Sequence, residues 1–274
     1  SRVRRNPTLA DLALHMSTSR LAEPQADWER LIPDSEWALY GRVLRRLREQ
    51  RIAFALGGGF AFSYYAHRWR DTKDIDLYVL PRMREPMIAL LDELGLRDYY
   101  ELVPYDRNWI YRSHRDGLIV DVIWAMANQR AQADERWLTH GPLISLRGVE
   151  VHVVPVEELI WAKLYVMQRD RCDWGDVLTL FYTQGNTLDW EHLFNRLGED
   201  RRLLSGALGI FSWMCPARAG QLPGWIWESV GLTPPEEDLD CTIERRRVEL
   251  LDTRDWFGPR APKIQDTRPA KSES

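Results

Sequence analysis

Two segments of this 274-residue chain have the composition of β-strands and carry acidic residues among apolar ones. One runs from Asp74 to Leu80 and the other from Leu118 to Trp124, and both are rich in branched and aromatic residues. Side chains on a strand alternate between its two faces, so Asp74 and Asp76 must project from the same face. Asp121 lies in the second segment. The fold must therefore bury two strands while accommodating three carboxylates.

Carboxylates side by side repel each other unless a cation lies between them. Hard divalent ions favour such oxygen ligands, and Mg²⁺ typically takes one or two carboxylates plus substrate phosphates. A third carboxylate from a neighbouring strand would complete a two-metal site, with ions ~3.5–4 Å apart that clamp a phosphoryl group. The three residues thus predict two Mg²⁺ ions, with Mn²⁺ as a substitute, and phosphoryl or nucleotidyl transfer. The alternative is an acidic pair at a strand edge that water, Lys or Arg satisfies.

A glycine-rich turn precedes the first acidic segment. Residues 52–56 predict a short buried strand, Gly57, Gly58 and Gly59 follow it, and residues 60–67 predict a helix. Glycines between a strand and a helix allow close backbone approach, and a helix N-terminus presents free N–H groups to an anion. A plain tight turn would explain one or two of these glycines equally well, but the nearby acidic pair favours an anion-binding turn.

The order of these motifs resembles that of the DNA polymerase β-like nucleotidyltransferase superfamily. The matching residues are Gly58-Gly59-Phe60-Ala61, Arg70 and Thr72-Lys73-Asp74-Ile75-Asp76. Within the superfamily, the sequence is most similar to the group that includes AbiEii-type abortive-infection toxins and related uncharacterised bacterial nucleotidyltransferases. That group has a later lysine and a late Asp-x-x-Asp, with counterparts here in Lys163 and Asp173-Trp174-Gly175-Asp176. The resemblance spans roughly residues 50 to 185 and does not specify the substrate.

The resemblance implies a role for each matching residue. Gly58 and Gly59 would cradle a triphosphate, and Asp74 and Asp76 would hold two Mg²⁺ ions. Asp121 would be the third carboxylate, which binds one metal ion and accepts the proton of the acceptor hydroxyl. The remaining predicted site residues neutralise phosphate charge or line the nucleotide site: Lys163, Arg70, Thr72, Lys73 and Asp176.

Lys163 also stands out without the resemblance. Residues 156–168 predict a helix, and Lys163 falls within its apolar stripe, whereas Glu157, Glu158 and Gln168 lie elsewhere on the helix. The stripe consists of Val156, Ile160, Leu164 and Met167. A lysine among apolar neighbours needs a counter-charge, which an acidic site or phosphates would supply. Alternatively, its stem lies on apolar surface while its ammonium reaches water.

The Asp-x-x-Asp motif has two interpretations. An Asp that opens a helix caps the first free N–H groups, and an acidic residue three positions later suits the helix dipole. We favour capping for Asp173. For Asp176, a position at the helix start and a position facing the nucleotide, or the polar network around Lys163, stay equally open.

The alternation of helices and strands predicts an α/β protein: a mixed-sheet nucleotidyltransferase core with a C-terminal helical subdomain. The expected boundaries are an irregular segment at 1–34, the core at 35–155, the helical subdomain at 156–231 and a partly disordered tail at 232–274. Asp116-Gly117 predicts a hairpin turn, so the strand of Asp121 should be antiparallel to its predecessor.

Net charge, the length of apolar runs and the cysteines limit the binding partners and the cellular location that we expect. The formal net charge of −4 argues against extensive nonspecific DNA coating but leaves room for tRNA at a local patch. No apolar run approaches the ~20 residues of a membrane span. Three scattered cysteines, with no Cys-x-x-Cys pair, predict a reducing cytoplasmic location.

These observations predict an enzyme that moves a nucleoside monophosphate from a triphosphate such as ATP to an acceptor hydroxyl and releases pyrophosphate. The acceptor could be a tRNA 3′ end or a protein hydroxyl, in a toxin with an antitoxin partner. The alternatives are a small-molecule acceptor such as an antibiotic, or a nucleotide-binding regulator without turnover.

Overall fold

The computed structural model describes residues 28–70, 72, 74–235, 247 and 250, and in this part of the chain a mixed sheet of seven strands forms in the order β3-β4-β5-β2-β1-β7-β6. The strands are β1 (Ala55–Leu56), β2 (Asp74–Tyr78), β3 (Arg97–Asp98), β4 (Ile110–Arg115), β5 (Leu118–Ile123), β6 (Leu143–Leu146) and β7 (Val149–Val153). The β2–β5 and β1–β7 pairs are parallel, and the other neighbouring pairs are antiparallel. The predicted α/β class with a mixed sheet is therefore confirmed.

The α-helices surround this sheet and continue beyond it. They are α2 (Asp34–Glu49), α3 (Gly58–Tyr65), α4 (Arg84–Glu93), α5 (Glu135–Thr139), α6 (Val156–Leu164), α7 (Trp174–Gln184), α8 (Trp190–Leu197), α9 (Arg201–Met214), α10 (Pro216–Ala219) and α11 (Gly224–Val230). Four 3-10 turns join them: η1 (Trp28–Leu31), η2 (Pro81–Met83), η3 (Tyr99–Glu101) and η4 (Gly198–Asp200). None of the described helices has the length and apolar character that a membrane span requires.

The hairpin between β4 and β5 forms at the predicted turn. Asp116 and Gly117 both have positive φ, 52° and 80°, which a two-residue type I′ turn requires. The turn sets the strand register, so that Arg115 faces Leu118 and Arg112 faces Asp121.

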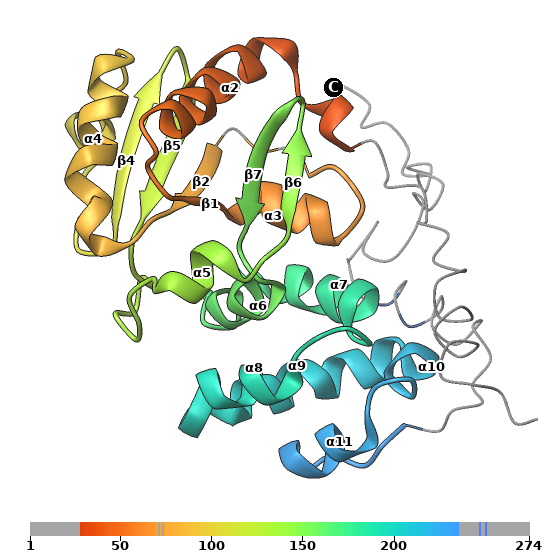
Figure 1. Ribbon diagram of the computed structural model, residues 1–274. Coiled ribbons are helices and arrows are strands. Elements are labelled where there is room, and N and C mark those ends of the chain that lie inside the picture. Colours follow the sequence, from red (N-terminus) through yellow and green to blue (C-terminus); the bar gives the residue numbers. More distant parts are fainter. Residues whose placement is uncertain (1–27, 71, 73, 236–246, 248–249, 251–274) are drawn as a thin grey trace, which may run out of the picture.

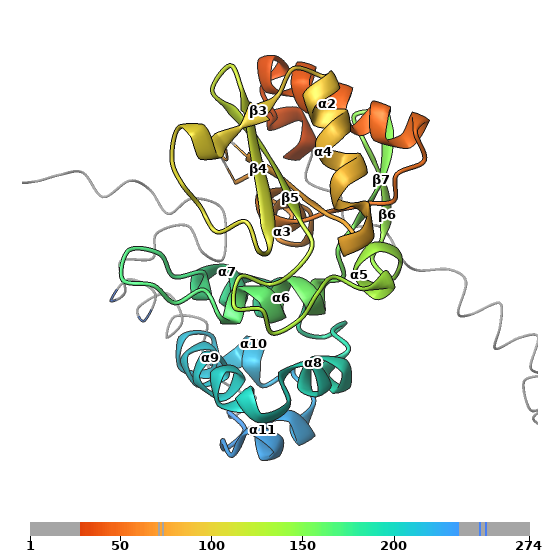
Figure 2. The same ribbon diagram turned by 90° about the vertical axis from the view of Figure 1, so that its left-hand side faces the viewer.

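The two faces of the sheet have different neighbours. Helices α2 and α4 lie side by side over one face (Figure 2), where Ile75 and Leu77 of β2 join an apolar core with residues of both helices. Because side chains alternate along a strand, Asp74 and Asp76 point to the opposite face. The packing of α2 and α4 thus directs the carboxylates away from the apolar core beneath these helices.

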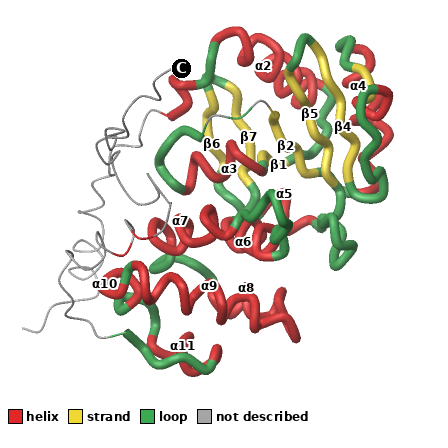
Figure 3. Tube along the Cα trace, turned by 180° about the vertical axis from the view of Figure 1, so that it is seen from behind, coloured by secondary structure: helices red, strands yellow, loops and turns green. Residues whose placement is uncertain are grey.

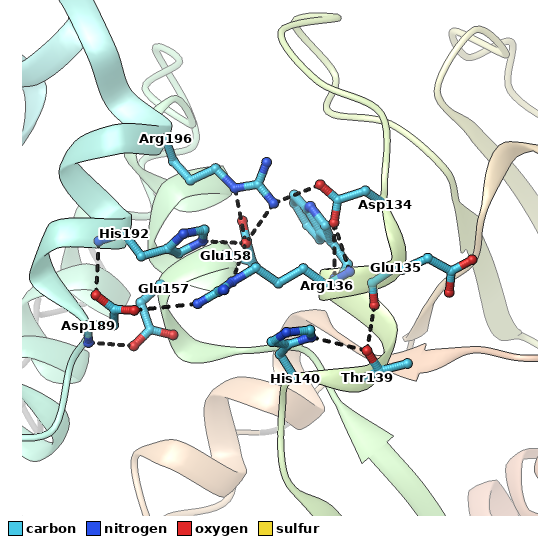
Figure 4. Close-up of polar contacts among 11 residues, drawn as sticks. Asp134, Glu135, Arg136, Thr139, His140, Glu157, Glu158, Asp189, His192 and Arg196 are labelled. Carbon is cyan, nitrogen blue, oxygen red and sulfur yellow. Dashed lines mark hydrogen bonds and ion pairs between the residues drawn. The ribbon is translucent and has the colours of Figure 1, made fainter.

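The helices from Val156 onward form layers beyond one end of the sheet, with α6 and α7 nearest to it (Figures 1 and 3). Helix α6 packs against α3, α7 and α8 and so has almost no solvent face. This corrects the expectation that Glu157 and Glu158 lie apart from the buried stripe, since both are buried. Figure 4 shows their contacts: Glu157 accepts a hydrogen bond from the Asp189 backbone N–H, and Glu158 meets His192 and Arg196.

Some predicted boundaries are wrong. The strand expected at 52–56 pairs only over Ala55–Leu56, and the helix expected at 156–168 ends at Leu164, before a bridge between Met167 and Cys172. Helix α5 and the short strand β3 were not predicted. The predicted tail beyond residue 235, apart from Arg247 and Leu250, lies outside the described residues, as do residues 1–27.

Candidate active site

The strand register gathers the three predicted carboxylates. Strands β2 and β5 are parallel neighbours, and Asp76 faces Asp121 directly across the pair. Residues paired in this way share a face of the sheet, and Asp74 joins them because it lies two positions before Asp76. The Asp121 side chain is only 1% exposed, whereas Asp74 and Asp76 are partly accessible.

The surroundings of Asp76 change the pKa of its carboxyl group. Burial, followed by the charges of Asp121 and Asp74, raises the pKa of Asp76, and the positive charges of Lys163 and Arg112 only partly oppose this. Asp74 accepts a hydrogen bond from the Thr72 hydroxyl, so Thr72 lies in the site as predicted.

The glycine turn lies against the acidic strand. Gly58 begins α3 with a φ of +50°, and a Cβ placed on it would lie 1.5 Å from Asp76 Oδ2. Only a residue without a side chain fits there, because both the backbone conformation and the space exclude a methyl group. A Cβ on Gly59 would meet Thr72 at 3.3 Å, and the Gly57 N–H donates to the Asp76 carbonyl at 2.8 Å. The N-terminus of α3, with its free N–H groups, therefore adjoins the carboxylates.

Lys163 projects from α6 into a second acidic group. Its side chain is buried, and Nζ donates to Asp173 Oδ2 at 2.8 Å and to Asp176 Oδ2 at 2.6 Å. The lysine therefore has carboxylate partners and does not extend its ammonium group into water. Asp176 also pairs with Arg70, a half-exposed residue that follows α3.

The prediction that the Asp173 side chain caps the helix is wrong. Asp173 occupies the N-cap position of α7, but its side chain accepts no hydrogen bond from the helix N–H groups. It instead bonds Lys163 and Arg171. Burial alone would raise the pKa of Asp173, but these two cations outweigh it and lower the pKa to about 2. A buried cation at Nζ attracts the carboxylate more strongly than exposed backbone N–H groups do.

Two arginines that the sequence analysis did not single out complete the site. Arg112 of β4 holds both oxygens of Asp121, with Nη2–Oδ2 at 2.6 Å and Nε–Oδ1 at 2.9 Å. The signal for Arg112 was present: counting back from the Asp116-Gly117 turn pairs it with Asp121. Arg171 lies in the α6–α7 loop, and its charge acts on Asp76 and Asp74 as well as on Asp173. No pattern in the sequence places that loop at the site.

The donor set suits a divalent cation at the acidic pair of β2. Two same-face carboxylates next to a helix N-terminus supply the hard oxygen ligands that Mg²⁺ prefers. Burial, and after it the neighbouring carboxylates, raise the pKa of Asp76, and a cation between Asp74 and Asp76 would offset the repulsive part. Over the described residues, however, no group of three or more His, Cys, Asp or Glu side chains is arranged to hold a metal ion. Asp121 faces Arg112 instead, so its role as a ligand stays a prediction.

The structure thus brings most of the predicted residues into two adjoining groups. One holds Gly58, Gly59, Thr72, Asp74, Asp76 and Asp121, and the other holds Arg70, Lys163 and Asp176. The two groups adjoin because α3 packs against β2 and also against α6 and α7. Lys73 lies outside the described residues.

Comparison with known proteins identifies the family of the chain. Residues 37–210, more than half of the chain, match the family model described as "Uncharacterised nucleotidyltransferase". No curated protein matches the chain.

Several solved structures resemble the chain weakly. A solution structure of the antibiotic-resistance factor ANT(2″)-Ia overlaps 63% of this chain and 95% of its own, with 18% identity and a TM-score of 0.46. The lincosamide antibiotic adenylyltransferase LnuA, with lincomycin bound, covers 52% of this chain and 94% of its own, at 13% identity and a TM-score of 0.40. An antigenic nucleotidyltransferase-like protein from Paracoccidioides brasiliensis covers 64% and 93%, at 19% identity and a TM-score of 0.38.

Proposed function

Because the chain belongs to the uncharacterised nucleotidyltransferase family, we propose that it transfers a nucleoside monophosphate from a nucleoside triphosphate to an acceptor hydroxyl and releases pyrophosphate. The observation that carries this proposal is the register of β2 and β5. That register puts Asp74, Asp76 and Asp121 on one face, directly beside the glycine turn of α3. Carboxylates next to a helix N-terminus combine a cation site with an anion site, which a metal-bound triphosphate requires.

Each group has a defined task in this proposal. Asp74 and Asp76 would hold Mg²⁺, and the N–H groups at Gly58 and Gly59 would receive phosphate oxygens. Bound Mg²⁺ would neutralise phosphate charge during the displacement. Arg70, the more exposed cation of the Lys163 group, could extend towards a phosphate, with Lys163 fixing the carboxylate that positions it.

The reaction forms one phosphate ester and breaks one phosphoanhydride. The acceptor oxygen attacks the α-phosphorus, the bond to the bridging oxygen breaks, and pyrophosphate leaves. Asp121 would accept the proton of the acceptor hydroxyl, a form of general-base help typically worth ~10²–10⁴ in rate.

For the acceptor, we propose a tRNA 3′ end or a protein hydroxyl, in a toxin controlled by an antitoxin. This finer assignment rests on the AbiEii-type pattern of Lys163, Asp173 and Asp176. A small molecule such as an antibiotic is the alternative acceptor, and a regulator that binds nucleotide without turnover is the alternative to an enzyme.

The test is transfer of label from each of the four nucleoside triphosphates to a cell lysate in the presence of Mg²⁺. With the label on the α-phosphate, we expect it to enter one fraction among RNA, protein and small molecules. With the label on the γ-phosphate, we expect it only in pyrophosphate, which distinguishes this transfer from that of a kinase.

Two variants with the same change of charge provide the control. Asp76→Asn should abolish labelling, because it removes a carboxylate from the proposed cation site. Asp116→Asn should retain it, since Asp116 is 84% exposed in a type I′ turn that accepts Asn. Labelling that survives Asp76→Asn in a folded protein would show that the catalytic assignment is wrong. Nucleotide binding without any labelled product would support the regulator.

A further inference from the structure

Asp121 has the least accessible carboxylate of the three, and its two oxygens are already occupied. Arg112 lies opposite it on β4 and reaches it with Nε and Nη2, at 2.9 Å to Oδ1 and 2.6 Å to Oδ2, with a longer contact of 3.2 Å between Nε and Oδ2. A guanidinium that bonds both oxygens of a carboxylate forms the strongest type of hydrogen-bonded ion pair in proteins. Arg112 uses one lone pair on each oxygen, so a metal ion that approaches Asp121 from the same side must displace the guanidinium, and one that approaches the remaining lone pairs meets its positive charge.

The surrounding chain holds Arg112 in place. Strand β3 pairs with β4 only at His114 and Ser113. At the next residue of β4, Arg112, the backbone N–H bonds the Tyr105 hydroxyl and not a β3 residue. The hydroxyl accepts a hydrogen bond from the Arg112 N–H at 3.0 Å and donates one to Asp98 at 2.9 Å.

The guanidinium also has a ring beneath it. The Cζ atom of Arg112 lies 5.9 Å from the centre of the Tyr99 ring, within the range of a cation–π contact. The Arg112 side chain remains 33% exposed, whereas Asp121 is 1% exposed. The guanidinium can therefore move towards solvent, while the carboxylate cannot.

We propose that Arg112 is a positioning residue that competes with a divalent cation for Asp121, so that this carboxylate joins the metal site only when the guanidinium is displaced. The inference rests on the proposed function, because it takes Asp74 and Asp76 as the cation site that Asp121 would complete. Its consequence is that Arg112 weakens metal binding by the free enzyme.

The test measures Mn²⁺ binding to the full chain by calorimetry, without nucleotide, so no activity is needed. We expect Arg112→Gln to bind Mn²⁺ about tenfold more tightly than the wild type, since a hydrogen-bonded ion pair no longer has to be broken. Arg107→Gln is the matched control. Arg107 lies between β3 and β4 and pairs with Asp98, not with Asp121, so the variant should keep wild-type affinity. The double variant Asp121→Asn with Arg112→Gln should lose the gain.

A folded Arg112→Gln protein with wild-type Mn²⁺ affinity would overturn the inference and leave the proposed transfer reaction untouched. A gain that persists in the double variant would also overturn it, because the effect would not pass through Asp121. Absence of Mn²⁺ binding in every protein would overturn both this inference and the metal dependence of the proposed function.

If Arg112→Gln does not fold, Arg112→Lys replaces it. Lysine keeps the charge but cannot form the two-pronged contact, so a smaller gain is expected, and unchanged affinity would again refute competition.

Discussion

Glu158 offers a direct test of what holds helices α5, α6 and α8 together. Its carboxylate is fully buried on α6, where Oε1 accepts from His192 Nε2 at 2.7 Å and from Arg196 Nη2 at 2.9 Å (Figure 4). Arg136 of α5 approaches the same oxygen at 3.9 Å. Glu158→Gln removes the negative charge while keeping the size of the side chain. We expect a large loss of stability, because three elements meet at this carboxylate.

The magnitude follows from burial. Removing one partner of a buried ion pair costs about 3–5 kcal/mol, because the remaining charges lose their compensation. Arg196 keeps its contact with Asp134 and some exposure to water, which favours the lower end, about 3 kcal/mol. For a chain of this size, that corresponds to a decrease in Tm of roughly 6 °C.

The assay is urea unfolding followed by far-UV circular dichroism, with Asp134→Asn as the control. Asp134 pairs with the same arginine, but its side chain is 48% exposed, and Asn retains the ability to cap α5. An exposed pair contributes about 0–1 kcal/mol, so Asp134→Asn should change the free energy of unfolding far less than Glu158→Gln. Equal losses in the two variants would refute the argument that burial of Glu158 makes it the principal link.

Two further predictions concern the groups beside the carboxylates. The pKa of Asp173 is lowered from 3.8 to about 2, so its ion pairs should contribute about 2 kcal/mol to folding above pH 4, and this contribution should be lost as the pH falls from 4 through 2. Acid titration of the unfolding free energy should show this loss in the wild type and a smaller one in Lys163→Met, and parallel curves would contradict it. Gly58→Ala should destabilise the protein and abolish nucleotide binding in equilibrium dialysis, because its Cβ would overlap Asp76. Gly148→Ala is the control: it has a similarly positive φ of +82° but open space around it, so it should cost only about 1 kcal/mol of backbone strain and leave nucleotide binding intact.

The parts of the fold that the sequence predicts well are those with local physical causes. The Asp116-Gly117 turn determines its own conformation, and that turn determines the register of β4 and β5. The strand of Asp74 alternates clearly between apolar and acidic residues, so its two faces were evident.

The misses have non-local causes. Only the packing of α3, α7 and α8 around α6 buries Glu157 and Glu158, and no periodicity within α6 predicts polar residues in a core. Asp173 has the sequence context of a helix cap, but the tertiary fold brings Lys163 to it. Sequence periodicity locates the buried face of a helix when one face is buried, and fails when all faces are.

The acidic residues of the site differ in how closely a positive side chain is paired with them. Arg112 forms an ion pair with Asp121. Lys163 and Arg171 both form ion pairs with Asp173 at the start of α7. The pKa of Asp76 is nevertheless raised, first by burial and then by Asp121 and Asp74, and Lys163 and Arg112 offset only part of this. Folding into this arrangement costs free energy that a divalent ion between Asp74 and Asp76 would return. Under the proposed function, a metal-bound triphosphate would bring a cation to the acidic strand next to the glycine turn and place its phosphates at the N-terminus of α3.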